Sequence, residues 1–353
     1  MHYSKYGVIL KSHLFKYTVG VLIVKKLLTI SLILILSFPI LFTYSKVCSA
    51  QLLLIDVKTD QQIYGVGEKI TVNGTVYYGT PLTTLIGIEI SDAFDHILTI
   101  RTLVSGDSIS GNWNVEVLDV TPCDSNGIPK QQFNRGDFAF FMIKVRNNMD
   151  SEEIITLTLS IYFAGGTAYT ASPLYHGPIM PKSTYTTLVS LGIPTDAPLG
   201  VGTAYANVYK SRPKNGGYPL CPEKAANFTV IGSGTPLPYI ETAPKTAGGI
   251  FTLYAAAPKT DCFLGNYTVY ATAFFYNQQV QDTTIFSLIL RGDVNLDGKV
   301  DLKDIVLIIG KFGTKKGDPN WQPIYDLNFD NKVDLKDIVI SIANFGNSGY
   351  YPK

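Results

Sequence analysis

Short runs in which apolar and polar residues alternate fill the chain from Gln51 to about residue 290. Prominent examples are "KITVNGTVYYG", "FAFFMIKVRN", "IITLTLSIYF", "TAYANVYK" and "YTVYATAFFY". These runs are rich in β-branched and aromatic residues, and Gly, Pro, Asn and Asp separate them. A period of two residues predicts strands, and no stretch here offers a convincing helix of ten or more residues. The pattern therefore predicts a mainly β body built from sandwiches.

The order of the runs predicts how two immunoglobulin-like β-sandwiches share this body. Two opening signatures, each with a Gly-acidic turn before a strand, precede two closing signatures, each with a Leu-Gly turn before a Tyr-rich strand: "YGVGEKITVNGTV" and "FNRGDFAFFMIKVRN", then "IPTDAPLGVGTAYANVY" and "APKTDCFLGNYTVYATAFF". We expect a host sandwich of residues 51–112 plus 233–290 and an inserted one of 113–232, because exposed loops accept insertions. Three serial domains remain the alternative.

The first fifty residues have the pattern of an export segment. They contain six Lys and no Asp or Glu, and they include the apolar run from Leu27 to Tyr44. Small residues precede Gln51, which favours a cleavable signal peptide of residues 1–50 over a retained N-terminal anchor. The basic region is long, so a translation start near Val24 stays open.

Charge excludes one class of partner. Without residues 1–50, the 29 basic residues fall by six to 23 against 28 acidic ones, a net charge of −5. No basic stripe is available to neutralise phosphates, so nucleic acid is not expected as a partner.

Cysteines and sequons suggest covalent modification of the exported body. Cys123 and Cys221 lie near the two ends of the inserted unit, and we expect a disulfide between them; three buried free thiols are the alternative. Closing so long a loop stabilises by about 4 kcal/mol in the chain-entropy treatment. Sequons at Asn73, Asn227 and Asn266 are candidate glycosylation sites, although their context is strand-like.

Catalytic signatures are missing from the body. The sequence has no G-x-S-x-G, no H-E-x-x-H and few histidines. A glycosidase needs two facing carboxylates, for which Asp92, Asp95, Glu152 and Glu153 are available. Their ordinary interpretation is solvated turn residues, so we expect no catalytic residue and no enzyme activity.

The same acidic twelve-residue pattern occurs twice after the body. "DVNLDGKVDLKD" begins at Asp293 and "DLNFDNKVDLKD" begins at Asp326, 33 residues later. Calcium takes oxygen ligands from positions 1, 3, 5, 7, 9 and 12 of such a loop, with a backbone carbonyl at position 7. The candidate ligands are Asp293, Asn295, Asp297, Lys299, Asp301 and Asp304 in the first copy, and Asp326, Asn328, Asp330, Lys332, Asp334 and Asp337 in the second.

Each acidic loop leads into an amphipathic segment and is not preceded by a helix. Position 6, which needs a left-handed backbone, is Gly298 in one copy and Asn331 in the other. Apolar residues then recur at helical spacing, and Gly313 and Gly346 are the predicted C-caps. The apolar positions are Leu302, Ile305, Ile309 and Phe312, with Leu335, Ile338, Ile342 and Phe345 as their twins. Each unit is thus half an EF-hand.

Residues 292–346 resemble a type I dockerin, a small module of two loop-helix calcium units that binds a cohesin domain on another protein. The resemblance implies two Ca²⁺ ions, a cohesin-bearing partner and a small α-helical module over residues 291–353. It assigns partner choice to loop positions 10 and 11, where many cellulosomal dockerins have small hydroxyl residues. Here these positions are Leu302 and Lys303 in the first copy, and Leu335 and Lys336 in the second.

Weaker resemblances concern the body. The "YGVGE" opening is similar to that of macroglobulin-type β-sandwiches, and the inserted unit resembles adhesion-type sandwiches. Together the patterns predict a secreted or cell-surface protein whose body is a spacer, adhesion or binding module. The alternative is a carbohydrate-binding or polysaccharide-degrading component of a cohesin-dockerin assembly. Membrane contact is expected only through the N-terminal segment, if it is retained.

Overall fold

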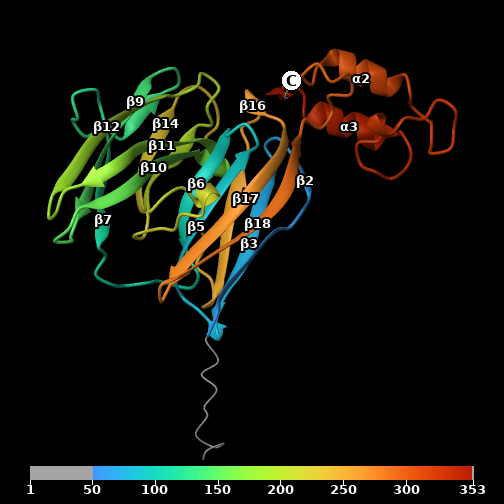
Figure 1. Ribbon diagram of the computed structural model, residues 1–353. Coiled ribbons are helices and arrows are strands. Elements are labelled where there is room, and N and C mark those ends of the chain that lie inside the picture. Colours follow the sequence, from blue (N-terminus) through green and yellow to red (C-terminus); the bar gives the residue numbers. More distant parts are fainter. Residues whose placement is uncertain (1–50, 352–353) are drawn as a thin grey trace, which may run out of the picture. The chain divides into compact units, whose positions relative to one another are not determined.

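The computed structural model describes residues 51–351, so the predicted export segment, residues 1–50, lies outside the described part (Figure 1). Strands dominate the described residues, and the two α-helices among them, α2 (Leu302–Ile309) and α3 (Leu335–Ala343), both follow the body. No helix within 51–351 is long and apolar enough to cross a bilayer. The predicted mainly β class with C-terminal helices is confirmed.

One sheet combines strands from both ends of the body. Its order is β2 (Ile63–Gly65), β18 (Gln278–Ile289), β17 (Gly265–Phe275), β5 (Leu85–Asp92) and β6 (Ile97–Val104). Strand β5 runs antiparallel to β17, with Ile90 opposite Val269, while β2 runs parallel to β18. Residues more than 150 positions apart in sequence are therefore hydrogen-bonded neighbours, as a nested chain order requires.

A second sheet joins two groups of strands through one bridge. The first group is β1 (Leu53–Thr59), β3 (Lys69–Tyr78), β4 (Thr80–Pro81) and β15 (Ile250–Ala256). The second group is β11 (Thr167–Ile179), β10 (Glu153–Phe163), β13 (Gly200–Tyr209), β14 (Lys224–Ile231) and β8 (Gln132–Asn134). Only the pair Thr167 and Ala256 connects the groups.

Two smaller sheets complete the described strands. The larger of them is β12 (Thr184–Gly192), β9 (Phe138–Asn147) and β7 (Val115–Cys123). The other pairs β16 (Cys262–Phe263) in parallel with β19 (Gly349–Tyr350) near the chain end. Short 3₁₀ turns lie at η1 (Ala164–Gly166), η2 (Pro213–Asn215) and η3 (Pro323–Tyr325).

The body has two large apolar cores. One is made mainly by residues 53–103 together with 251–290, and it includes Phe251 and Val269, both fully buried. The other is made only by residues between 115 and 230. Packing is tight in the first core, because a Cβ atom added at Gly74 would lie 2.0 Å from the Phe251 ring. Alternating apolar residues along each strand supply both cores.

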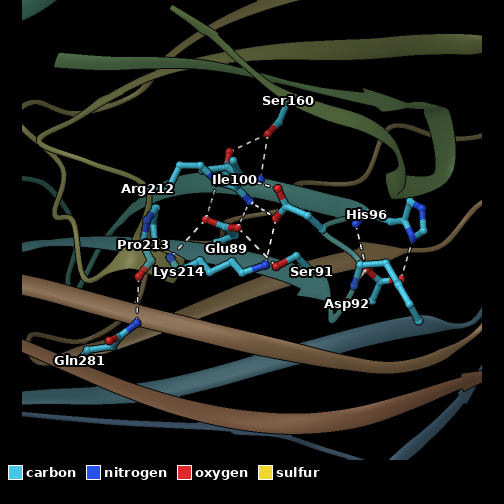
Figure 2. Close-up of polar contacts among 12 residues, drawn as sticks. Glu89, Ser91, Asp92, His96, Ile100, Ser160, Arg212, Pro213, Lys214 and Gln281 are labelled. Carbon is cyan, nitrogen blue, oxygen red and sulfur yellow. Dashed lines mark hydrogen bonds and ion pairs between the residues drawn. The ribbon is translucent and has the colours of Figure 1, made fainter. Parts of the chain in front are cut away.

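Buried polar pairs cross between the strands of these two cores (Figure 2), beside a small apolar cluster of Ile100, Ala171 and Tyr209. Glu89 on β5 is fully buried and pairs with Arg212, which also binds Asp95 at 2.7 Å. Hydrogen bonding to the Arg212 guanidinium holds the pKa of Asp95 well below its usual value. Nearby, the Ser160 hydroxyl donates to the Ile100 carbonyl at 2.6 Å and accepts from its N–H at 3.0 Å.

Candidate functional site: the duplicated acidic loops

The two acidic repeats form two loop-helix units, here called the first loop (residues 293–304) and the second loop (residues 326–337). Helix α2 begins directly after Asp301, whose side chain accepts the Lys303 N–H at 2.7 Å. The Asp304 carboxylate accepts the Asp301 N–H in return, which completes a capping box. Asp334 and Asp337 do the same for α3. Positions 9 and 12 of each loop therefore also start its helix.

The carboxylates at positions 1 and 12 are buried in both loops. Asp293 and Asp304 are 4% and 0% exposed, and Asp326 and Asp337 are 5% and 0% exposed. They accept backbone N–H groups: Gly298 donates to Asp293 Oδ2 at 2.9 Å, as Asn331 does to Asp326 at 2.8 Å. Burial raises the pKa of Asp293.

The side chains at positions 3, 5 and 9 curl over the loop backbone. Asn295 Oδ1 accepts the Asp297 N–H at 2.8 Å, and Asp297 Oδ1 accepts the Lys299 N–H at 3.1 Å. Asn328 and Asp334 repeat the first of these contacts and the helix cap in the second loop. Ten of the twelve predicted ligand positions therefore present side-chain oxygens to their own loop.

Position 6 has the predicted left-handed backbone in both copies. Gly298 has φ +86° and Asn331 has φ +69°. A Cβ atom at Gly298 would lie 2.7 Å from the Gly349 carbonyl oxygen, so the first loop has no room for a side chain there. Glycine and asparagine are the residues that adopt this conformation at least cost.

The backbone carbonyl at position 7 makes no hydrogen bond to the segment that pairs with its loop. Lys299 and Ser348 lie opposite each other as an antiparallel β-bridge pair. The hydrogen bonds of this bridge are made by the flanking residues: the Gly349 N–H donates to the Gly298 carbonyl and the Val300 N–H to the Asn347 carbonyl, both at 3.0 Å. The carbonyl of a non-hydrogen-bonded pair member points away from its partner strand. The Lys332 bridge to Lys315 has the same pattern. Both carbonyls can therefore face the loop interior, as a calcium ligand must.

The loop residues fit a divalent cation by charge. Among residues 51–351, no Lys, Arg or His pairs with Asp293, Asp304, Asp326 or Asp337, while lysines do pair with more exposed loop acids. Asp330 Oδ1 is buried and has no hydrogen-bond partner. No three acidic side chains in the described residues already form a metal cage, because they face backbone N–H groups. Small rotations toward the loop centre would supply the oxygen donors that Ca²⁺ prefers.

Each helix exposes an apolar face, which includes the leucine that the resemblance assigned to partner choice. Leu302 and Leu335 are 66% and 64% exposed, next to the exposed Lys303 and Lys336. Each helix continues this face with three more apolar side chains, each more than half exposed: Val306, Ile309 and Phe312 on the first, and Val339, Ile342 and Phe345 on the second. We call these two sets the twin stripes. Val306 and Val339 were missed by the sequence analysis, although the repeated "KDIV" places them at equivalent positions.

The interior of the module is correspondingly small. Its buried cluster is Val294, Ile308 and Val333, with Trp321, Tyr325, Leu327 and Ile338 partly buried around it. The predicted C-caps are also corrected, since α2 ends before Gly310 and α3 before Asn344. Gly313 and Gly346 both have φ +85° and lie in the turn that follows each helix.

Tyr351 is a loop neighbour that the sequence did not indicate. Its phenol donates to Asp293 Oδ2 at 3.0 Å, and burial raises its pKa well above the usual value, so it remains a donor. Only the folded chain brings position 1 of the first loop and this tyrosine together, because 58 residues separate them.

The predicted disulfide does not form in the structure. Cys123, Cys221 and Cys262 are all free and buried. Cys123 is opposite Phe140 at one end of β7, whereas the Cys221 thiol accepts from the backbone of Val117. Six strand residues separate these two places, or about 20 Å, which is far beyond disulfide reach. Burial raises the pKa of Cys221 to about 12, so it is an inert thiol.

The three sequon asparagines lie within strands and are engaged. Asn73 accepts from Thr252 at 2.9 Å, and Asn227 accepts from Thr203 at 3.0 Å. Asn266 accepts from the neighbouring strand at 2.7 Å. Glycosylation at these positions remains a prediction.

The class of the C-terminal module follows from comparison with known families. Residues 291–345 match the family model of the dockerin type I domain, which agrees with the two loop-helix units described above. The chain therefore carries a dockerin type I domain at its C-terminus, after a mostly β body. Dockerin type I domains typically bind calcium, and a dockerin domain implies attachment to a cohesin-bearing partner.

Comparison with curated proteins gave no match. Solved structures with similar portions include Pseudomonas fluorescens alkylpurine DNA glycosylase AlkC (9% identity, 34% of this chain and 31% of that chain, TM-score 0.27). They also include the C-terminal domain of wzt (13%, 35% and 78%, TM-score 0.29) and a CARDB domain from Pyrococcus furiosus (13%, 35% and 94%, TM-score 0.24). The chain thus spans about a third of the glycosylase. Similarities this low carry no functional argument.

Proposed function

We propose that this protein is exported and attaches its β-sandwich body, through two calcium-loaded dockerin units, to a cohesin-bearing partner outside the cell or at its surface. The twin stripes are the observation that carries the proposal. A module with so small an interior gains nothing in stability from eight exposed apolar side chains, so an unfilled contact surface is their natural explanation.

Equivalence of the stripes supports binding in two orientations. Leu302 and Lys303 occupy the same loop positions as Leu335 and Lys336, and all four are exposed on the first turns of α2 and α3. A two-fold turn of the module would present nearly the same surface. Either stripe alone is therefore sufficient for cohesin binding in this proposal.

The body is proposed to be non-catalytic, because three of its candidate carboxylates have structural partners. Asp92 binds the His96 ring at 2.7 Å and two backbone N–H groups of its own turn. Asp95 pairs with Arg212 and Lys214, and Glu153 pairs with Lys210 at 2.7 Å. None of the three is free to act as a general acid or base without first breaking an ion pair or a turn.

We further propose the nested arrangement, a host sandwich of residues 51–112 plus 233–290 with 113–232 inserted. Strand pairing across more than 150 residues and a separate core within 115–230 support it. Export rests on residues 1–50 as a signal peptide, and membrane contact would come only from that segment if it were kept. In this proposal the body is a rigid spacer.

The test is binding to immobilised type I cohesin domains. The full chain should be retained in 2 mM Ca²⁺ and released by excess EGTA. Leu302→Asp or Leu335→Asp alone should weaken binding only slightly, while the double variant should abolish it. Ile128→Asp changes an apolar residue of the body that is 61% exposed and serves as the matched control. Calcium-independent retention, or full binding by the double variant, would refute the proposal.

A further inference from the structure

A polar cavity of about 340 Å³ lies between β6, strands β13 and β14, and the segment 239–243. It is distant in sequence from the dockerin loops, and the attachment proposed above does not use it. Ligand pockets in proteins start at about this volume and occur preferentially where two structural units meet. The cavity is therefore large enough to hold a small ligand.

Its floor is rigid and electrically neutral. Arg101, 1% exposed, binds the Glu223 carboxylate twice, at 2.6 and 2.8 Å, and donates to Thr242 at 2.8 Å. The guanidinium also lies 3.3 Å from the centre of the Tyr205 ring. All of its nitrogen atoms are thus engaged, so Arg101 offers no free positive charge to an anionic ligand.

Three side chains around the opening remain available to a ligand. The Tyr239 ring is 53% exposed. Glu241 is an exposed carboxylate without a hydrogen-bond or ion-pair partner among residues 51–351. Asn227 uses its Oδ1 to accept from Thr203, which leaves its amide N–H groups as donors. One aromatic face, one acceptor and one donor therefore border the same small cavity.

This combination fits a neutral polar ligand better than an anion or an apolar molecule. An anion would meet Glu241 and the Glu223 carboxylate, and an apolar ligand would leave Glu241 and Asn227 desolvated without partners. A sugar ring has an apolar face of C–H groups that stacks on an aromatic ring, and hydroxyls that both donate and accept hydrogen bonds. We propose that this cavity is a saccharide site, in which a neutral pyranose stacks on Tyr239 and its hydroxyls bond to Glu241 and Asn227.

The body then has a ligand of its own in addition to the spacer role. The dockerin would hold the protein on its partner, while the cavity would hold a neutral glycan. The two activities use different residues, so each can fail without the other.

The test uses the full chain in Ca²⁺, probed on an array of neutral oligosaccharides and then by calorimetry with the best soluble hexasaccharide found. Tyr239→Ala should weaken binding about fivefold, since aromatic contacts contribute about 1 kcal/mol beyond their area and 1.4 kcal/mol corresponds to a factor of ten. Glu241→Gln should weaken it severalfold. Glu241 is exposed and unpaired, so Glu241→Gln should leave the melting temperature unchanged, whereas Tyr239→Ala should lower it slightly because the Tyr239 phenol hydrogen-bonds to Tyr205 and Thr203.

Tyr77→Ala on β3 is the matched control, because Tyr77 is 41% exposed and lies outside the cavity. The Leu302→Asp, Leu335→Asp double variant should bind glycan normally while losing cohesin. The proposal is overturned if no neutral glycan binds, or if Tyr239→Ala, Glu241→Gln together leave binding intact. It is also overturned if binding is lost instead in Tyr169→Phe, which alters the separate cleft of about 1010 Å³.

Discussion

The first and second loops share a ligand set but differ in what holds them. Residues after α3 pair with the first loop, where Gly349 and Val300 make two bonds of 3.0 Å. The second loop is held instead by the linker after α2, through Lys316 and Val333 at 2.9 and 2.8 Å. The same local sequence has thus been placed in two different settings.

The strand on the first loop continues into the body. Its residues Gly349 and Tyr350 pair with β16, and the Leu264 N–H donates to the Tyr350 carbonyl at 2.9 Å. Val300, at position 8 of the first loop, is buried with the larger body core rather than with the module interior. Order in the first loop therefore depends on the C-terminal tail, Asn347 to Tyr351, whereas order in the second does not.

The second loop has more and closer lysine–carboxylate contacts than the first. In the second loop Lys332 lies 3.1 Å from Asp334, and Lys336 lies 3.3 Å from Asp330. In the first loop the only lysine contact is between Lys303 and Asp297, at 3.9 Å. The lysines of these pairs are at least half exposed and their acids at least a quarter exposed, so each pair contributes little energy. We therefore expect the tail to decide how the two loops differ.

Calcium removal should have the largest effect. At a free concentration 100-fold above the dissociation constant, each bound ion stabilises its loop by about 2.7 kcal/mol. In EGTA we expect amide exchange to accelerate throughout residues 291–346, first in the second loop, because the first keeps its bonds to the tail. Exchange followed by mass spectrometry measures this, with strands β5 and β17 as internal controls. Unchanged protection in the chelator would contradict it.

Removing one calcium ligand from each loop in turn should show how the tail makes the two loops differ. Asp304→Asn and Asp337→Asn each remove a buried position-12 carboxylate, so each should abolish one of two calcium equivalents in calorimetry. The affinity should fall by more than the roughly 10–100-fold that loss of an outer-shell partner costs. Only Asp304→Asn should also accelerate amide exchange in the tail. Asp150→Asn, at a 93% exposed body carboxylate, is the control, and equal tail exchange in both variants would argue against coupling.

Local and distant information divide what the sequence could predict. Ligand spacing and the left-handed position 6 depend on neighbours within twelve residues, so Gly298, Asn331 and both helix starts were predicted correctly, unlike the C-caps. Which side chains of each helix stay exposed depends on tertiary packing, and the sequence did not indicate that Val306 and Val339 lie exposed beside Leu302 and Leu335. The contact of Tyr351 with Asp293 has no local signal at all.

The cysteines show the same limit. Cys123 and Cys221 lie near the ends of one segment, which favoured a bridge, but strand register places them at different levels of the same core. Register depends on pairings with distant residues. A pattern of openings and closings can suggest which strands pair, yet it does not give the level at which two thiols lie.

Substitution at position 6 should distinguish the loops by a smaller amount. Alanine at a left-handed position costs about 1–2 kcal/mol, so both Gly298→Ala and Asn331→Ala should lower the module's melting temperature. Gly298→Ala should lower it more, because its Cβ would also push the Gly349 carbonyl, 2.7 Å away. Asn331→Gly, which is unstrained, controls for loss of the side chain. Equal effects of the two alanine variants would show that the tail does not constrain the first loop.

Removal of a single hydroxyl should produce the smallest change. Tyr351→Phe deletes the donor to Asp293, so Asp293 is less well oriented and the first loop should lose about 1 kcal/mol of calcium binding energy, or about fivefold in affinity. Tyr350→Phe is the matched control, because its hydroxyl donates to Asp261 at 3.0 Å and not to a loop residue.

Two backbone amides report on the loops separately during a calcium titration followed by NMR. The Gly298 N–H donates to Asp293 in the first loop, and the Asn331 N–H donates to Asp326 in the second. Tyr351→Phe should shift only the Gly298 midpoint to higher calcium. A shift of both midpoints would mean that the tail stabilises the module as a whole, and a shift of neither would mean that the Tyr351 hydrogen bond does not affect metal binding.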